Sequence, residues 1–329
     1  MEINIPLLIT YVLSLIVMLG LPIVLAFLIV RRFKVSWLVV LTGVLTFIAS
    51  QVLRVPASYG INTLFNNGIL PIPSDYWAPL VSAVIAGLMA GIFEETARWV
   101  GFKVLKRKAE KFGSALALGV GHGGAESILL AVLGTATTLF TVLFFNAGAQ
   151  IAKGISTGEV QYTLFQIEQF WMNPWHTGLL PGVERLIAIV VQIFLSTLVW
   201  RAVVERSFLW FLMAVLFHTI VDGVAVFLSS IGWSYWPIEG ILSIFMLISL
   251  YLIYRFWRDE KELEEEIGEF EVKDDDEDDE EEDDDEDDDY EDDELEALDE
   301  LEDEVEEIEG DVSETSGDDE DQSDPSSQS

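Results

Sequence analysis

Seven ionisable residues lie in the interior of long apolar stretches of this sequence, away from their ends, where a charge is costly and needs a reason. They fall into three groups whose members are three or four positions apart and therefore share one face of a helix. The groups are Glu94, Glu95 and Arg98; His122 and Glu126; and His218 and Asp222. Such faces cannot contact lipid, so we expect all three to point into a helix bundle and to meet there.

The residue types in these groups suit hydrolysis of a peptide bond. A buried carboxylate can act as a general base, so Glu94, helped by neutral His122, could deprotonate a water that attacks a peptide carbonyl. His218 could donate a hydrogen bond to the developing oxyanion, with Asp222 fixing its tautomer or position. Arg98 would balance the adjacent glutamates, since two buried carboxylates cannot both be ionised cheaply without a cation.

The same residue types could instead bind a metal. Histidine and carboxylate suit zinc and similar ions, and the ligands would be Glu94, His122 and His218. The sequence has no HExxH motif, so no motif implies a metal, and it has no cysteine, which excludes thiolate ligands and a cysteine nucleophile. No cofactor is therefore certain, and a divalent metal such as zinc stays open.

A structural alternative is that these polar residues only hold helices together, as buried polar groups in membranes often do. Three stacked groups at one depth argue against it. The glycines around His122 lie inside an apolar span, so they predict close helix packing or room for a substrate backbone rather than a phosphate-binding loop. His176, in an interfacial loop, is assigned no role.

The elements that position these residues are apolar runs of the length needed to cross a bilayer, roughly 20 residues as a helix. Seven runs qualify: 6–30, 35–53, 78–102, 113–148, 183–200, 207–229 and 237–257. The fourth is too long for one ordinary crossing and is predicted to bend near Gly134 or to form two segments. The first has neither a basic leading region nor a cleavage site, so it predicts a spanning helix and not a signal peptide.

Distance along the helices places the three groups at similar depth. Glu94 lies nine residues before Lys103, and His122 lies eleven after Lys111, so both are roughly 13–17 Å from the same membrane boundary. His218 lies twelve residues after its flanking arginine, roughly 18 Å from that boundary. The runs alternate in direction, yet the side chains arrive at one height.

Basic residues outside the runs predict the orientation. With one crossing at 113–148, twelve of them fall on one side and only Arg54 and Lys153 on the other, in stretches 54–77 and 149–182 that are predicted to be loops. Lys and Arg are retained in the cytoplasm, so we expect a multi-pass cell-membrane protein with its N-terminus outside and its C-terminal tail inside. An eighth crossing would put four of the twelve outside.

Charge divides the chain at Arg258. Residues 1–258 contain 16 Lys or Arg against 12 Asp or Glu, whereas residues 259–329 contain 2 against 44. The first part is predicted to be an all-α, polytopic transmembrane helix bundle, and the second a disordered, acidic, low-complexity tail. Within the tail, residues 293–310 could form a short amphipathic helix that binds a cytoplasmic partner.

The motifs resemble a known group of proteases. Glu94-Glu95-Thr96-Ala97-Arg98 is similar to the EExxxR motif of the type II CAAX-prenyl-endopeptidase and bacteriocin-processing (CPBP) group of glutamic-type intramembrane proteases. Leu118 to His122 looks like its FxxxH motif, and His218 to Asp222 like its HxxxN/D motif. The flanking FEETARWVGF and GVGHGGAESI resemble more closely the YhfC branch, described as intramembrane peptidases and sometimes labelled metalloproteases.

The resemblance, which covers most of residues 80–225, implies roles. In the family the first glutamate and the FxxxH histidine are thought to activate water, which here implies Glu94 and His122. The HxxxN pair is thought to form the oxyanion hole, which implies His218 and Asp222. An ionised Asp222 cannot donate to an oxyanion, so it must be protonated or act through His218. Leu118 in place of phenylalanine should affect packing only, and Glu126 is added as a fifth member of the site.

The expected function is therefore that of an intramembrane endopeptidase that cleaves a membrane-associated peptide or protein substrate in the lipid bilayer, with no nucleic-acid partner. An ion- or proton-coupled transporter uses similar buried Glu, His and Asp residues and is the main alternative, although no convincing internal repeat supports it. An inactive scaffold whose tail recruits partners is a third.

Overall fold

The computed structural model describes residues 2–152 and 158–278, and within these ranges all regular structure is helical. Seven helical stretches are long and apolar enough to cross a membrane, which confirms the predicted count. They are Ile5–Phe33, Trp37–Asn66, Ala78–Leu105, Phe112–Asn146, Trp175–Val204, Phe208–Ser230 and Tyr235–Glu262. The protein is thus an all-α, multi-pass membrane protein.

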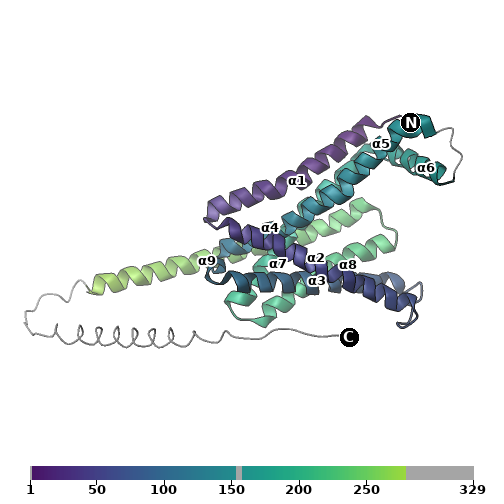
Figure 1. Cartoon of the computed structure of the whole chain (residues 1–329). Helices are drawn as coiled ribbons and strands as arrows, with labels where there is room; N and C mark the ends of the chain where they lie inside the picture. Colours follow the sequence, from purple (N-terminus) through teal and green to yellow (C-terminus); the bar gives the residue numbers. More distant parts are fainter. Residues whose placement is uncertain (1, 153–157, 279–329) are drawn as a thin grey trace, which may run out of the picture. The chain divides into compact units, whose positions relative to one another are not determined.

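The helices follow the chain in a simple order (Figure 1). They are α1 (Ile5–Phe33), α2 (Trp37–Asn66), α3 (Ala78–Leu105), α4 (Phe112–Leu130), α5 (Thr137–Ala152), α6 (Gly158–Met172), α7 (Leu180–Val204), α8 (Phe208–Ser230) and α9 (Tyr235–Asp278). Short 3₁₀ turns, η1 (Lys106–Ala109) and η3 (Trp175–Leu179), precede α4 and α7. The first helix is capped by Asn4, whose side chain accepts from the Leu7 amide.

The long fourth run is interrupted where the sequence predicts. A π-helical turn, η2 (Ala131–Ala136), contains Gly134 and joins α4 to α5. Glycine weakens regular helix, and π turns of this kind form as single-turn interruptions of α-helices. Figure 1 shows the three pieces as one continuous run beside α1, which contacts both α4 and η2. The run therefore crosses once.

The second helix is longer than predicted. Residues 54–66 were expected to begin a loop, but α2 continues through them to Asn66 and includes Pro56. The physical reason lies in the spacing of Arg54, Ser58 and Asn62, which recur every four residues and give this stretch one polar helical face. As a result, Arg54 belongs to a spanning helix.

The last helix continues beyond the predicted start of the tail. It ends at Asp278, twenty residues past position 258, and ion pairs between residues four apart support the extension. Arg255 lies 4.0 Å from Asp259, and Arg258 lies 3.2 Å from Glu262. Such pairs and the good helix propensity of glutamate favour helix over coil. The predicted amphipathic segment at 293–310 lies outside the described residues.

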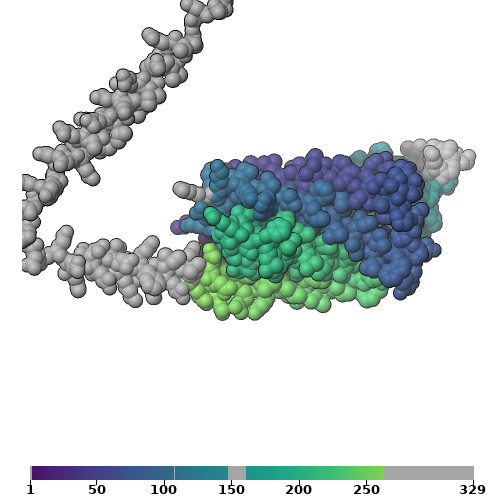
Figure 2. Space-filling view, turned by 90° about the horizontal axis from the view of Figure 1, so that it is seen from below, coloured from purple at the N-terminus to yellow at the C-terminus, as the bar shows by residue number. Residues whose placement is uncertain are grey.

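Contacts group residues 1–264 into one compact unit and residues 265–329 into another. The centre of the first unit is α7: 72% of the residues in the most apolar part of its span are buried, against 22–33% in the other six. α1, α3, α4 and α8 all pack against it. In the space-filling view (Figure 2) green segments of this region lie between blue helices and yellow-green α9. The predicted domain boundary at 258 stays a prediction.

Glycines allow the helices that carry the site to approach closely. A Cβ atom on Gly121 of α4 would collide with the carbonyl oxygen of Val40 in α2, and one on Gly43 of α2 with that of Leu118. Small residues at such crossings let backbones touch. The packing that the sequence predicts for the glycines around His122 is confirmed.

Candidate active site

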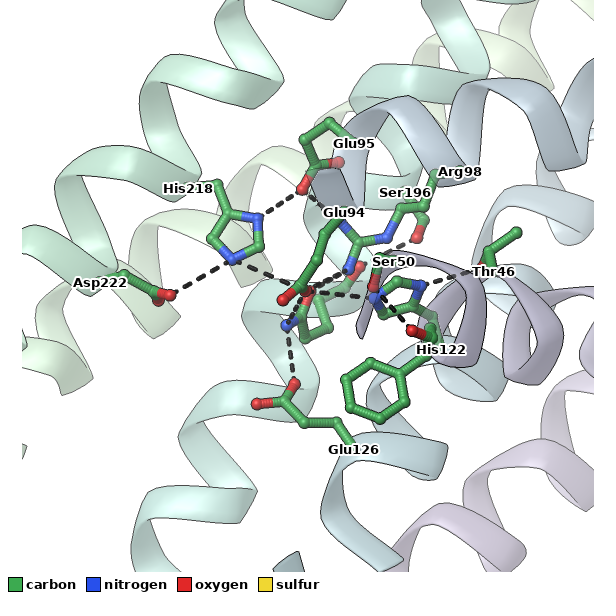
Figure 3. Close-up of polar contacts among 12 residues, drawn as sticks. Thr46, Ser50, Glu94, Glu95, Arg98, His122, Glu126, Ser196, His218 and Asp222 are labelled. Carbon is green, nitrogen blue, oxygen red and sulfur yellow. Dashed lines mark hydrogen bonds and ion pairs between the residues drawn. The ribbon is translucent and has the colours of Figure 1, made fainter. Parts of the chain in front are cut away.

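Three helices bring their polar groups together, as the sequence predicts (Figure 3). Glu94 of α3, His122 of α4 and His218 of α8 are all buried. The Nε2 atoms of His122 and His218 lie 3.2 Å and 3.9 Å from Glu94 Oε2. The carboxylate of Glu94 therefore lies between two imidazole rings, and this arrangement is the centre of the candidate site.

A hydroxyl group on α2 orients His122. The Thr46 hydroxyl donates to the Gly43 carbonyl at 2.7 Å, so it accepts from Nδ1 of His122 at 2.9 Å. This assigns the proton of the neutral ring to Nδ1 and leaves a lone pair on Nε2. The lone pair faces Oε2 of Glu94, another acceptor, so both atoms can accept from one donor, such as a water beside them. The sequence analysis did not identify Thr46.

The second imidazole is held by Glu95. Its Oε1 atom lies 2.5 Å from Nδ1 of His218 and also pairs with Arg98. Nε2 of His218 lies 3.6 Å from Oδ2 of Asp222. The sequence assigned Asp222 the task of fixing the His218 tautomer; here Glu95 holds Nδ1, and Asp222 stands on the other side of the ring.

Two arginines balance the two buried glutamates. Arg98, which is fully buried, pairs with Glu95 and lies 3.9 Å from Glu94 Oε2, as expected for its predicted role. Arg54, which was assigned to a loop, donates to Glu94 Oε1 at 2.5 Å, beside Gln51 at 3.3 Å. The sequence signal for this second cation is the row of polar residues on one face of α2. This row is recognised only if the stretch after Arg54 is taken as a helix and not as a loop.

Glu126 reaches the site indirectly. It accepts from Arg185 Nη1 and from Gln192 Nε2, both at 2.8 Å, and among the described residues it forms no hydrogen bond or ion pair with His122. Gln192, on α7, lies 3.5 Å from Glu94 Oε2 and also accepts from Arg98. It is the lone amide in its apolar run, a signal that could have found it.

Asp222 lies at the exposed edge of the site. Its side chain is 41% exposed, whereas His218 beside it is buried. Both line a cavity of about 90 Å³, together with Glu126 and Gln192. At about 30 Å³ per water molecule, a polar cavity of this size can hold a few waters next to the candidate catalytic groups.

Comparison with known proteins decides the family. The sequence profile of the YhfC intramembrane metalloprotease family matches residues 16–242, more than half of the chain. The chain belongs to this family. It is 36% identical over 149 residues to "Uncharacterized membrane protein YhfC" of Bacillus subtilis (strain 168), a match that covers 45% of this chain and 57% of that protein. No solved structure matches.

All residues of the candidate site fall inside the matched region of the YhfC profile. The resemblance to the YhfC branch is thus confirmed, and the chain is a member of a family described as membrane proteases. The wider relation to the CPBP group stays a prediction, as do the orientation of the termini and the catalytic roles of individual residues.

The family description implies a metal, and the donor chemistry of the site fits one. Glu94 offers an oxygen and His122 a free Nε2 lone pair, and the Nδ1 contact between His218 and Glu95 is the carboxylate–histidine pairing common behind metal-binding histidines. Within the described residues, however, no group of three or more His, Asp or Glu side chains has the geometry to hold a metal ion. The residue types therefore suit a metal ion, but in this structure their side chains are arranged to form hydrogen bonds and ion pairs with one another.

Proposed function

We propose that this YhfC-family protein is an intramembrane endopeptidase that hydrolyses a peptide bond of a membrane-associated substrate. One observation carries the proposal: the Glu94 carboxylate lies between two buried imidazoles. One of these imidazoles, that of His218, also lines a small cavity of mixed polar and apolar lining that can hold water. Few structural roles require two neutral bases and a carboxylate at one point inside an apolar bundle.

In the proposed reaction, Glu94 and His122 activate the water. Oε2 of Glu94 and Nε2 of His122 are two acceptors 3.2 Å apart, so a water beside them can donate one hydrogen to each. Glu94 then takes the proton as the water oxygen attacks the peptide carbonyl. Thr46 keeps Nδ1 protonated and so keeps Nε2 free for this purpose.

His218 and Asp222 serve the oxyanion in this proposal. With Nδ1–H donated to Glu95, His218 becomes a donor at Nε2 only when it carries a second proton. Asp222, 3.6 Å away and open to the cavity, can deliver that proton. An ionised Asp222 cannot itself donate a hydrogen bond to the oxyanion. In this proposal it does not need to, because it acts through His218.

If a metal is bound, Glu94, His122 and His218 are the residues that would hold it. It would supply Lewis-acid activation of the water and the carbonyl. Cleavage measured with and without a zinc chelator separates the two variants of the proposal: activity that survives complete metal removal favours the glutamate–histidine form, and activity restored only by added zinc favours the metal form.

The test is cleavage of single-span substrates by full-length protein in proteoliposomes. Glu94→Gln and His122→Ala should each lower the rate about 10²–10⁴-fold, the usual contribution of general acid–base catalysis. Glu110→Gln, the same substitution at an exposed position, is the matched control and should cleave normally. Undiminished cleavage by both site variants would sink the mechanism.

The same liposomes separate the proposal from its alternatives. A coupled transporter would move solute in response to an ion gradient and leave the peptides intact, and a scaffold would do neither. Cleavage that depends on Glu94 without solute flux supports the peptidase.

A further inference from the structure

The Arg54 guanidinium is only partly satisfied. It donates through Nη1 to Glu94 Oε1 at 2.5 Å, and this is its single hydrogen bond within the described residues. Its other N–H groups are not among the buried atoms that lack a partner, and 32% of its side chain is exposed. Arg54 thus joins the buried Glu94 carboxylate to donors that a ligand can reach.

A groove between α2 and α3 lies close to this arginine, although Arg54 itself does not line it. It has a volume of about 500 Å³ and begins one helical turn from Arg54, at Ser58, and five residues from Glu94, at Met89. Hydroxyl and amide groups, such as those of Ser58 and Asn62, and the carboxyl group of Asp75 line it together with apolar side chains. Such a mixed lining suits a polypeptide, with polar backbone and apolar side chains, better than a lipid chain.

We propose that Arg54 is a latch which the substrate opens: a carboxylate of the polypeptide in the α2–α3 groove takes over the guanidinium and frees Glu94 Oε1. The assignment of the ligand as substrate rests on the proposed function. Guanidinium binds carboxylates in a two-pronged fashion, so exchanging one carboxylate for another preserves its strongest kind of contact.

Glu94 can release Arg54 without being left as an uncompensated charge. Arg98 remains 3.9 Å from its Oε2 atom, Gln192 donates to Oε2, and Nε2 of His122 also lies next to Oε2. Among the described residues, Oε1, by contrast, is held by Arg54 and Gln51 alone. The exchange therefore frees Oε1, the Glu94 oxygen that is bonded from α2, and leaves the contacts of Oε2 intact.

The absence of cysteine from the chain makes a direct labelling test clean. Full-length Ser58→Cys protein in liposomes is labelled with a thiol-reactive methanethiosulfonate in the presence of three acetylated Leu–Ala peptides. One has a free C-terminal carboxylate, one is its C-terminal amide, and one is an amide with an internal glutamate. The first and third separate a terminal from a side-chain carboxylate.

Either carboxylate peptide should slow labelling about five-fold more than the plain amide. This is the gain in affinity that one partly exposed ion pair gives. Arg54→Gln in the same background should abolish the difference, and Arg54→Lys should keep part of it. Glu94→Gln should enlarge it, because the internal competitor for the guanidinium is gone.

Equal protection by acid and amide peptides, protection by none of them, or a difference that persists in Arg54→Gln would overturn the proposal. Labelling needs no turnover, so its outcome is independent of catalysis. If Glu94→Gln abolishes cleavage while the acid and amide peptides protect equally, the latch fails and the peptidase stands. If the carboxylate preference holds while Glu94→Gln cleaves normally, the peptidase fails and Arg54 remains a carboxylate site.

Discussion

At the scale of residues, the site depends on which ring nitrogen of each histidine is hydrogen-bonded to a supporting side chain and which one faces Glu94. His122 is held through Nδ1 by Thr46 and His218 through Nδ1 by Glu95, so both present Nε2 to Glu94. The sequence predicts Glu94, His122 and His218, because an ionisable side chain inside an apolar span is energetically costly. It does not predict Thr46, because a threonine in a spanning helix is cheap and carries no comparable signal.

Thr46 should be a positioning residue. Thr46→Val keeps the side-chain shape and removes the acceptor for His122 Nδ1–H, so kcat should fall about 10–100-fold, as for other outer partners of functional histidines. Thr46→Ser should restore most of the rate. Thr63→Val, farther along the same helix, is the control. A valine variant with full activity and unchanged pH profile would show that the hydroxyl does not orient His122.

Asp222 should tolerate asparagine but not alanine. An asparagine amide can donate to the oxyanion directly, so Asp222→Asn should stay within about ten-fold of the parent rate, whereas Asp222→Ala should lose about 10²–10³-fold. The comparison of kcat for the two variants checks this. Equal rates would remove Asp222 from the oxyanion site.

At the scale of elements, hydropathy and length predict the seven spans and the break at Gly134, because both follow from local composition. The end of α2 could not be predicted in the same way. Pro56 and the polar residues after Arg54 are typical of a loop, and they hide the single polar helical face on which Arg54 and Ser58 lie. The Arg54–Glu94 pair depends on that extension, and so it was missed.

Close approach of α2 and α4 should be sensitive to added bulk. Gly121→Val puts a side chain against the Val40 carbonyl and should destabilise the protein by about 1–3 kcal/mol, the usual cost of overpacking. Thermal unfolding in detergent measures it. Gly20→Ala, in α1 where no atom lies within 4 Å of an added Cβ, should leave Tm unchanged or slightly raised. A lower Tm for both variants would point to a general loss of helix flexibility instead.

At the scale of the whole molecule, every residue of the candidate site belongs to the compact unit of residues 1–264. Removal of residues 265–329 should therefore leave the cleavage rate per folded protein within about two-fold of the full chain, because the second unit contributes no residue to the candidate site. Proteoliposomes with each form check this. A large loss would give the acidic tail a direct part in catalysis or substrate capture.

The central claim is that Glu94, with His122, activates water for peptide hydrolysis. Single-turnover cleavage in H₂¹⁸O tests it most directly. The account predicts ¹⁸O in the new C-terminal carboxylate with the parent protein and with Glu110→Gln, and no product above background with Glu94→Gln. Equal product from Glu94→Gln, or product without ¹⁸O, would contradict it.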